Sequence, residues 1–454
     1  MAYRGGPRRA GAATARYHPL VLAIRWLFVL VGAILGVFYP FVPPILAERG
    51  FTPAEIGLTT ALAAVAFTLS VPVWGHLADF VLGRVVALRI AAVGSTIAVL
   101  GLVLDGPPVV IGLLIIGYAA FESALAPLAD AVAVNALSAA PRSYPRVRLL
   151  SSLGFAGASI LAGRLYDETG FGPAPFLWAV TGLAILVVTR WIPDVPRFRG
   201  PSPGDAAPSD AAPGSPVPST LTPGGVPAPG VPAPGVPAPG ASTRAEPRLA
   251  RSRGGSFVLV LRTQPRLRGL LLGLGLVHVG MLAGFTFLAL RLLDLGGQAS
   301  DVALSAGISA IAEIPAMALV PRIVGRVGVR ALLVAGILLY GLVMVSWAFL
   351  ADPSLIIATR LASGVALAVI TIAAVMTIAA LLPAELQATG QGLYQTVGFG
   401  VAAIVANAVG GLVYGSGGAT PLFLGTAVLA VLGAVVAWRF TPAPTNMAPV
   451  RSGP

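Results

Sequence analysis

The feature that most constrains this chain is a series of long apolar segments that contain almost no charge. A transmembrane helix needs about 20 mostly apolar residues to cross the hydrocarbon core of a bilayer. Twelve segments meet this requirement and predict twelve membrane-spanning helices. They are 22–47, 55–78, 85–104, 108–133, 149–166 and 172–193 in the first half, and 269–293, 302–321, 329–350, 354–382, 390–414 and 420–440 in the second.

The composition indicates that membrane-spanning helices make up nearly all of the folded structure. Of the 454 residues, 56% are hydrophobic and only 10% are charged. This is more apolar surface than a soluble core of that length buries, so lipid is the expected solvent. We therefore expect an all-α membrane protein. The chain has no cysteine, which excludes a disulfide framework and thiol chemistry.

The basic residues indicate the topology. The chain carries a net charge of +12, and all of its 29 basic residues are arginines. They gather in alternate loops: before the first helix, between the fourth and fifth, and between the eighth and ninth. The positive-inside rule then places both termini and the central loop in the cytoplasm, as an even number of helices requires. We expect a multi-pass protein of the cell (inner) membrane, and we attribute the positive charge to topology rather than to nucleic acid.

A segment between the sixth and seventh helices divides the chain into two halves. Residues 197–255 are rich in Pro, Gly, Ser and Ala, and Val226-Pro-Ala-Pro-Gly230 is repeated through Gly240. This composition predicts a disordered cytoplasmic linker, either a spacer or a docking site for a partner. The expected domains are an N-terminal tail (1–21), a six-helix bundle (22–196), the linker (197–255), a second six-helix bundle (256–441) and a C-terminal tail (442–454).

The two halves share a local order of residues at an offset of about 245. In the first half, Pro72 is expected to end the second helix, and Gly83-Arg84 precedes the next apolar run. In the second half, Pro315 and then Gly328-Val-Arg330 occupy similar places. Two parallel repeats of six helices are related by a pseudo-two-fold axis along the membrane normal. This arrangement predicts a solute site between the halves, near the middle of the membrane.

The loop after the second predicted helix reads Gly75-His-Leu-Ala-Asp79-Phe-Val-Leu-Gly83-Arg84. It resembles the G-x-L-A-D-x-x-G-R signature of the major facilitator superfamily. The resemblance implies the major facilitator fold of two pseudo-symmetric six-helix bundles, with Gly75, Asp79, Gly83 and Arg84 as a gating motif that latches the cytoplasmic side. Asp79 can pair with Arg84 or accept hydrogen bonds from a helix N-terminus, and Gly83 permits a tight turn. A capped turn with no gating role is the alternative.

Four further passages resemble the branch that contains lactose permease, nucleoside–proton symporters and phenylpropionate permeases. They are Tyr39-Pro-Phe-Val-Pro43, 144–155, Ala312-Glu313-Ile-Pro315 and 388–394. The resemblance implies that Asp130 and Arg148 bind the solute and that Glu313 connects the solute and proton sites. Ser363 stands where this branch has a histidine in the tenth helix, and the carboxylate that follows it is absent. Proton coupling therefore remains an open question.

The few charged residues inside the predicted helices are the candidates for function. A charge at the bilayer centre costs at least about 2.5 kcal/mol on insertion scales, so each one needs a role or a partner. Glu313, flanked by apolar residues, is the candidate for proton coupling, with a structural hydrogen bond as the alternative. Glu122 and Asp130 share one face of the fourth helix and are expected to bind substrate with Arg148. The alternative pairs Asp130 with Arg146 or Arg148 at the cytoplasmic helix ends.

Two further residues have two interpretations each. His278 in the seventh helix can titrate near neutral pH and is a second candidate for proton coupling, although a lone histidine is often structural. Arg360 lies about two turns into the tenth helix. It is deep enough to attract an anion, but its long side chain could also reach the outer interface.

These observations favour a secondary transporter that moves a small polar or weakly acidic solute of the sugar, nucleoside or aromatic acid class by alternating access. The runner-up is a proton-driven exporter of drugs or metabolites, and an intramembrane enzyme or a solute sensor is a remote alternative. The chain has no lysine for a P-loop and no HExxH or GxSxG motif in its helices, so we expect no enzyme. We expect no cofactor and no metal. The expected partners are the small-molecule substrate, membrane lipid and, if transport is coupled, protons; we expect a monomer that binds no nucleic acid.

Overall fold

A computed structural model describes residues 8–104, 106–136, 144–194 and 253–442, and within these ranges all regular structure is helical. Twelve of its helices are long and apolar enough to cross a membrane, which confirms the twelve predicted spans. The spans are Pro19–Glu48, Pro53–Leu82, Arg84–Val103, Pro108–Ala136, Val147–Thr169 and Ala174–Trp191, then Pro265–Asp294, Ala299–Val327, Val329–Phe349, Pro353–Leu381, Leu386–Gly417 and Ala419–Phe440.

The first half contains the elements up to Trp191. They are α1 (Arg8–Phe38), η1 (Tyr39–Phe41), α2 (Val42–Glu48), α3 (Pro53–His76), η2 (Leu77–Leu82), α4 (Arg84–Leu100), η3 (Gly101–Val103), α5 (Pro108–Glu122), α6 (Leu125–Ala136), α7 (Tyr144–Thr169), α8 (Ala174–Val188) and η5 (Thr189–Trp191). Helix α1 begins at Arg8, so most of the predicted tail 1–21 is helical.

The second half begins at Arg253. Its elements are α10 (Arg253–Thr263), α11 (Pro265–Asp294), α12 (Ala299–Val327), α13 (Val329–Phe349), α14 (Pro353–Leu381), α15 (Ala384–Gln395), η6 (Thr396–Val401), α16 (Ala402–Gly417) and α17 (Ala419–Phe440). Helix α10 takes up the last residues of the predicted linker 197–255. The rest of that linker, and the predicted C-terminal tail beyond residue 442, lie outside the described residues.

Proline interrupts some spans and is tolerated in others. Pro127 has no N–H for the carbonyl of Ser123, and the fourth span breaks there into α5 and α6. The prediction that Pro72 ends the second helix is wrong, because α3 continues past it to His76 and then as the π-helix η2. Within a membrane, neighbouring helices and local changes of helix type satisfy the carbonyl that proline frees, so the span can continue.

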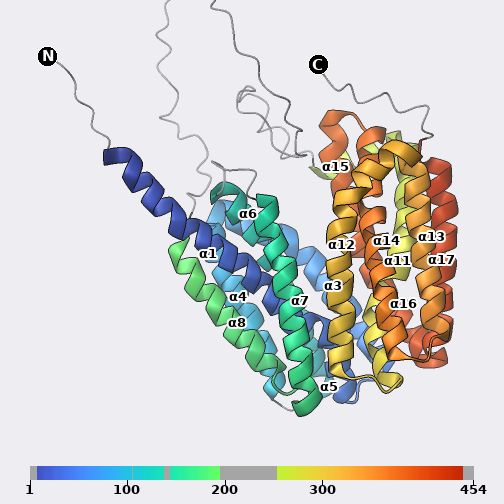
Figure 1. The fold of residues 1–454 in the computed structure, drawn as a ribbon, viewed down its shortest axis with the longest axis horizontal. Helices are drawn as coiled ribbons and strands as arrows, with labels where there is room; N and C mark the ends of the chain where they lie inside the picture. Colours follow the sequence, from blue (N-terminus) through green and yellow to red (C-terminus); the bar gives the residue numbers. More distant parts are fainter. Residues whose placement is uncertain (1–7, 105, 137–143, 195–252, 443–454) are drawn as a thin grey trace, which may run out of the picture.

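The helices form two bundles that touch at one end (Figure 1). The N-terminus of α1 and the C-terminus of α17 lie at the same end, which we call the terminal face; the other end is the opposite face. The bundles pack through α3 against α16 and α7 against α12. At the opposite face Gly57 meets Gly411, and the Ser300 N–H donates to Asp167 Oδ1 at 2.9 Å. Figure 1 shows the bundles diverging toward the terminal face.

The two halves repeat each other in their turns. All six described glycines with positive φ fall into three pairs separated by about 245 residues: Gly50 with Gly296, Gly83 with Gly328, and Gly170 with Gly418. The second span of each bundle also begins with a capping box, formed by Thr52 and Glu55 in the first half and by Gln298 and Asp301 in the second. The internal repeat therefore extends to individual turns and caps.

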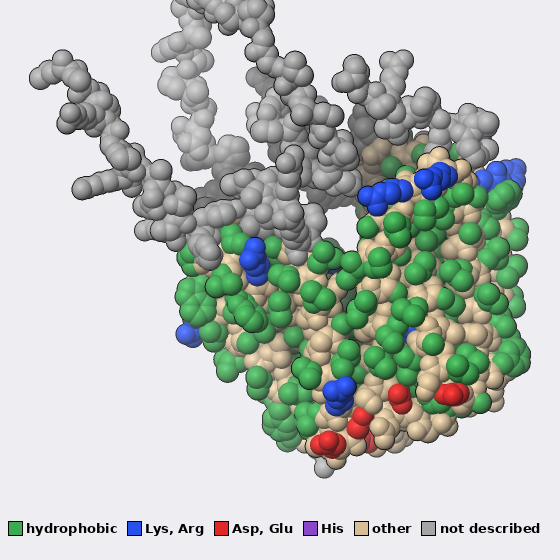
Figure 2. Space-filling view, in the orientation of Figure 1, with side chains coloured by type: hydrophobic (Ala, Val, Ile, Leu, Met, Phe, Trp, Pro, Cys, Tyr) green, Lys and Arg blue, Asp and Glu red, His purple; other side chains and the backbone are tan. Residues whose placement is uncertain are grey.

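Charge is unevenly distributed between the two ends. Figure 2 shows acidic side chains along the opposite face, whereas arginines gather at the terminal face of the second bundle. The helix ends at the terminal face carry Arg84 of α4, Arg148 of α7, and Arg322 and Arg326 of α12. A membrane protein with this pattern has one strongly basic end, as the positive-inside rule requires of the cytoplasmic side.

Candidate functional site

A central cavity of about 490 Å³ lies between the two bundles. Its wall comes from α1, η1, α2, α3, α5 and α7 on one side and from α11, α12, α14, η6 and α16 on the other. Most of the lining is aliphatic or aromatic. Its polar members are Tyr39, Thr60, Thr68, Tyr118, Glu122, Thr286, Ser305, Arg360 and Asn407. A few polar groups in an apolar wall hold a small solute in one orientation.

Glu122 is the acidic residue of this lining. It is the last residue of α5, at the break that Pro127 causes, so its side chain lies at the middle of the fourth span. The carboxylate has no hydrogen bond or ion pair with any described residue. Tyr118, one turn earlier, also lines the cavity, and its buried hydroxyl has no hydrogen-bond partner in the described chain. The carboxylate and the hydroxyl are therefore both available to a solute.

On the other side of the cavity, the second bundle contributes an amide. The Thr286 hydroxyl of α11 donates to Asn407 Oδ1 of α16 at 2.8 Å, which fixes the orientation of the amide. Aromatic rings flank these polar groups. Tyr39 of η1 and Phe285 of α11 face each other across the bundles with ring centroids 6.0 Å apart. The cavity thus combines hydrogen-bonding groups with flat apolar surfaces.

A second cavity of about 230 Å³ is lined by the C-terminal bundle and by Phe155 of α7. It shares Phe155, Leu282, Phe285, Ala306, Arg360 and Phe399 with the first. Arg360 is 3% exposed, so it does not extend to the outer interface. Its guanidinium donates to the Ser305 carbonyl at 3.2 Å and to Ser363 Oγ at 3.0 Å. It also lies over the Phe285 and Trp347 rings, at 5.7 and 5.4 Å. These contacts fix a cation where the two cavities meet.

Glu313 and His278 both line the second cavity. Glu313 is close enough to Arg360 for the two side chains to interact electrostatically. His278 is fully buried and has a partner for each ring nitrogen: Leu274 O lies 2.7 Å from Nδ1, and the Tyr394 hydroxyl lies 3.2 Å from Nε2. The carbonyl can only accept, so Nδ1 carries the proton. Both ring nitrogens are thus occupied, as in a structural histidine, and a coupling role for His278 stays a prediction.

Asp130 and Arg148 lie together, but away from both cavities. The Arg148 Nη1 atom contacts Asp130 Oδ1 and Oδ2 at 2.8 and 2.9 Å. The pair joins α6 to the start of α7 near the terminal face, and about half of the Arg148 side chain is exposed. Neither residue is among the described lining of the two cavities. Their role in binding substrate stays a prediction that this conformation does not display.

Because the pair lies outside the cavities, we expect Asp130→Asn and Arg148→Gln each to change the affinity for solute by less than about threefold. An exposed ion pair contributes about 1 kcal/mol or less to stability. Solute-induced thermal shifts of the two variants measure this. A loss of affinity of tenfold or more in both would show that the pair reaches the solute in another conformation.

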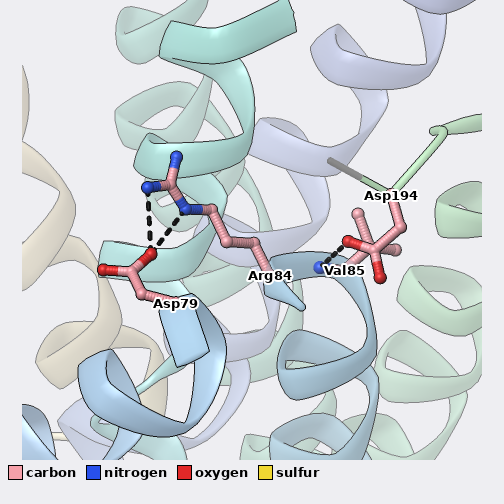
Figure 3. Close-up of polar contacts among 4 residues, drawn as sticks. All are labelled: Asp79, Arg84, Val85 and Asp194. Carbon is pink, nitrogen blue, oxygen red and sulfur yellow. Dashed lines mark hydrogen bonds and ion pairs between the residues drawn. The ribbon is translucent and has the colours of Figure 1, made fainter. Parts of the chain in front are cut away.

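The residues of the predicted gating motif form a compact turn at the terminal face. Arg84 contacts Asp79 Oδ1 through Nε and Nη2, both at 2.9 Å, which is one of the two arrangements expected (Figure 3). Gly83 has a φ of 90°, a conformation that favours glycine, and Gly75 lies one turn before Asp79 in α3. Asp194, which sequence reasoning did not select, accepts a hydrogen bond from the Val85 N–H at 3.2 Å. The turn is therefore held by two carboxylates.

Sequence reasoning also missed Tyr39, Tyr118, Thr286 and Asn407. A polar residue within an apolar helix is the available signal, and Asn407 is such a residue in the eleventh span. The described residues contain no group of three or more His, Asp or Glu side chains that could hold a metal ion. The chemistry that these groups support is the binding of a small solute by hydrogen bonds and aromatic contacts.

Comparison with known proteins gives the family. The model of the MFS_1 like family matches residues 21–425, from the first span to the start of the twelfth. The chain belongs to the MFS_1 like family. A curated relative, the maltose permease of Geobacillus stearothermophilus, is 26% identical over 389 residues, 85% of each chain. The uncharacterized transporter YwbF of Bacillus subtilis (strain 168) is 27% identical over 157 residues, 34% of this chain and 38% of that protein.

Solved structures show the same fold for this MFS_1 like chain. A mutant form of the nucleoside transporter NupG has a TM-score of 0.71 at 15% identity, covering 93% of this chain and 98% of NupG. A bacterial homolog of the human lysosomal transporter Spinster, inward-facing and unoccupied, has a TM-score of 0.66 at 13% identity, covering 94% and 97%. The family match and the curated relative, together with this fold, show a multi-pass membrane transporter of the major facilitator type and not an enzyme, as the sequence predicted.

Proposed function

We propose that this chain is a proton-coupled symporter that carries a small hydroxylated solute, with a sugar as the first choice, across the cell (inner) membrane. The observation that supports this most is Glu122, a carboxylate without a hydrogen bond or ion pair in the described chain, in the lining of a cavity between the bundles. Such a group has two uses in transport. It can accept hydrogen bonds from solute hydroxyls, and it can bind the proton that neutralises it when the solute leaves.

The rest of the lining fits a solute with hydroxyl groups. Asn407 and Tyr118 can donate to solute oxygens or accept from solute hydroxyls, and Tyr39 and Phe285 offer ring faces to the apolar side of a sugar or a nucleobase. The similarity to a maltose permease over 85% of each chain supports a sugar within this class. Nucleosides and aromatic acids remain members of the class to be tested.

The positive-inside rule supports an orientation with the terminal face and both termini in the cytoplasm. In this orientation the bundles are closed on the outer side, where Gly57 meets Gly411 and Asp167 binds Ser300 N–H. The described conformation then faces the cytoplasm. We expect the chain to function as one polypeptide with two bundles, joined by the linker and working as a monomer.

Transport into proteoliposomes with an imposed pH gradient tests the proposal. We expect labelled maltose to accumulate above equilibrium when the outside is acidic, and a protonophore to abolish this accumulation. Uridine and phenylpropionate test the other members of the class. Vesicles of both orientations, loaded with an amphipathic cation, test the exporter alternative. Transport of the cation against its gradient, without accumulation of any hydroxylated or acidic solute, would contradict the proposal.

Glu313 is expected to couple the proton without contacting the solute, because it lines the smaller cavity and interacts electrostatically with Arg360. Glu313→Gln should lower gradient-driven accumulation by about 100-fold while leaving solute exchange and affinity nearly unchanged. Uptake and counterflow in the same proteoliposomes measure the two activities. Unchanged accumulation that still responds to pH would remove Glu313 from the coupling mechanism.

A further inference from the structure

The terminal ends of the two bundles are related by the repeat but differ in charge. In the first bundle, Arg84 follows the left-handed Gly83 and pairs with Asp79 at 2.9 Å. In the second bundle, Arg330 comes two residues after the left-handed Gly328, and the end of α12 before it contains Arg322 and Arg326 but no acid. No described carboxylate forms an ion pair with these three arginines; the two described salt bridges lie in the first bundle.

The helices that begin at these turns differ in the same way. The N-terminus of α4 receives a carboxylate, because Asp194 accepts from the Val85 N–H at 3.2 Å (Figure 3). The N-terminus of α13 begins at the equivalent glycine and has no side-chain cap. A helix N-terminus attracts an anion through its unpaired N–H groups and its dipole. Among the described residues, a carboxylate thus caps α4 and none caps α13.

Side chains around the start of α13 provide a second and independent observation, because some of their buried polar groups have no hydrogen-bond partner in the described chain. The Arg330 guanidinium lies over the ring of Trp438, with Cζ 4.0 Å from the ring centroid, so α17 fixes its position. The Nε atom of Arg330 is buried and has no hydrogen-bond partner in the described chain. One turn beyond Trp438, Thr441 is 3% exposed, and its hydroxyl also has no partner among the described residues. A buried donor left without a partner destabilises the folded state.

We propose that the corner between the start of α13 and the end of α17 binds the phosphate group of an anionic phospholipid. The phosphate takes the place that the carboxylates of Asp79 and Asp194 fill in the first bundle. It accepts hydrogen bonds from the Arg330 guanidinium and compensates the uncapped N-terminus of α13, and the positive charge of Arg326 adds to the attraction. The site lies outside both central cavities and does not depend on the proposed substrate.

The surroundings of this corner select a lipid over a free anion. Trp438 is half-exposed, as expected of an aromatic side chain at the membrane interface. Farther along α13 and α17, toward the membrane centre, the outer surface consists of exposed aliphatic side chains, among them Leu338, Val431 and Val435. A lipid bound through its phosphate at the corner can lay its acyl chains along this surface. Free phosphate would gain none of that contact.

The spacing between Asp79 and Arg84 also provides the decisive variant. Asp79 lies five residues before Arg84, and the position five residues before Arg330 is Gly325. A Cβ atom at Gly325 would have no atom within 4 Å, so a side chain fits there. Gly325→Asp therefore places a carboxylate at the spacing used in the first bundle and should displace the lipid. Gly325→Asn has nearly the same shape without the charge and is the matched control.

Native mass spectrometry of the full-length protein in detergent, titrated with phosphatidylglycerol or phosphatidylcholine, measures the binding. We expect a phosphatidylglycerol molecule to be retained in preference to phosphatidylcholine and to raise the unfolding temperature. Arg330→Gln and Gly325→Asp should each weaken its binding by about tenfold or more. Gly325→Asn, and Arg190→Gln at an exposed position of the first bundle, should leave it unchanged.

Three results would overturn the proposal. They are equal retention of the two lipids by the unaltered protein, full retention of phosphatidylglycerol by both Arg330→Gln and Gly325→Asp, and a rise in unfolding temperature with inorganic phosphate alone that equals the rise with lipid. The last result would identify a free anion site. The unfolding temperature of each variant without lipid shows whether it is folded, and Gly325→Asp is expected to be at least as stable as Gly325→Asn.

Discussion

Glu122→Gln is expected to abolish proton-driven accumulation of the solute and to lower its affinity by about tenfold or more. Glutamine has nearly the same size and can still accept one hydrogen bond, so the cavity keeps its shape. It cannot carry a negative charge or bind a proton. Hydrogen bonds to a charged partner contribute about 1.5–3 kcal/mol, which corresponds to a loss of affinity of roughly 10- to 150-fold.

Two measurements separate this effect from a general loss of folding. Solute-induced thermal shifts give the affinity, and uptake into proteoliposomes with and without a pH gradient gives the coupling. Glu168→Gln is the matched control, because Glu168 is an exposed carboxylate at the opposite face on α7. Glu313→Gln provides the contrast within the mechanism, since it should lose accumulation but keep affinity. If Glu122→Gln accumulates solute with a normal response to pH, Glu122 only lines the cavity and has no part in coupling.

The second large effect is expected at Gly57, where the bundles meet at the opposite face. A Cβ atom there would lie 2.6 Å from Gly411 Cα and 2.5 Å from the Asn407 carbonyl oxygen. Both neighbours are backbone atoms and cannot rotate away. Gly57→Trp should therefore prevent closure of the opposite face and shift the population toward conformations open on that side.

The magnitude follows from the cost of overpacking, about 1–3 kcal/mol where the surroundings can relax and more where they cannot. We expect the population closed at the opposite face to fall at least about tenfold, and net transport to fall with it, while solute still binds from the opposite side. Gly425→Trp is the matched control, because a side chain at Gly425 meets no atom within 4 Å. Normal transport by Gly57→Trp would show that the contact does not have to close.

The number and approximate limits of the spans could be predicted because each apolar run must match the thickness of the bilayer. The tight turn with its Asp79–Arg84 pair could be predicted because Gly83 and these two charges are local features, and its gating role stays a prediction. Whether a span continues past a proline or breaks near it could not be predicted. Pro72 and Pro127 look alike in the sequence, yet α3 continues past the first and the fourth span breaks before the second. The difference depends on which neighbours satisfy the freed carbonyl.

The candidate site was only partly predictable for a related reason. In a soluble helix the apolar stripe shows which face is buried, but in a membrane the lipid-facing and core-facing sides are both apolar. The sequence therefore did not show that Arg360 of α14 would donate to Ser305 of α12, or that Thr286 would bond to Asn407. Nor did it show that Asp194 would cap α4, since 109 residues separate it from Val85.

The central claim is that one cavity between two bundles opens to each side of the membrane in turn. The chain has no cysteine, so pairs of cysteines can be introduced and spin-labelled without background. One pair, Val81→Cys with Arg326→Cys, joins exposed positions across the terminal face, and the other, Glu168→Cys with Asp352→Cys, joins exposed positions at the opposite face.

Distances between the spin labels, measured with and without solute and with Gly57→Trp in the background, test the claim directly. We predict that the terminal-face distance shortens and the opposite-face distance lengthens together, and that Gly57→Trp produces the same change without solute. Distances that stay constant under all conditions, or that change in the same direction at both faces, would contradict alternating access in this chain.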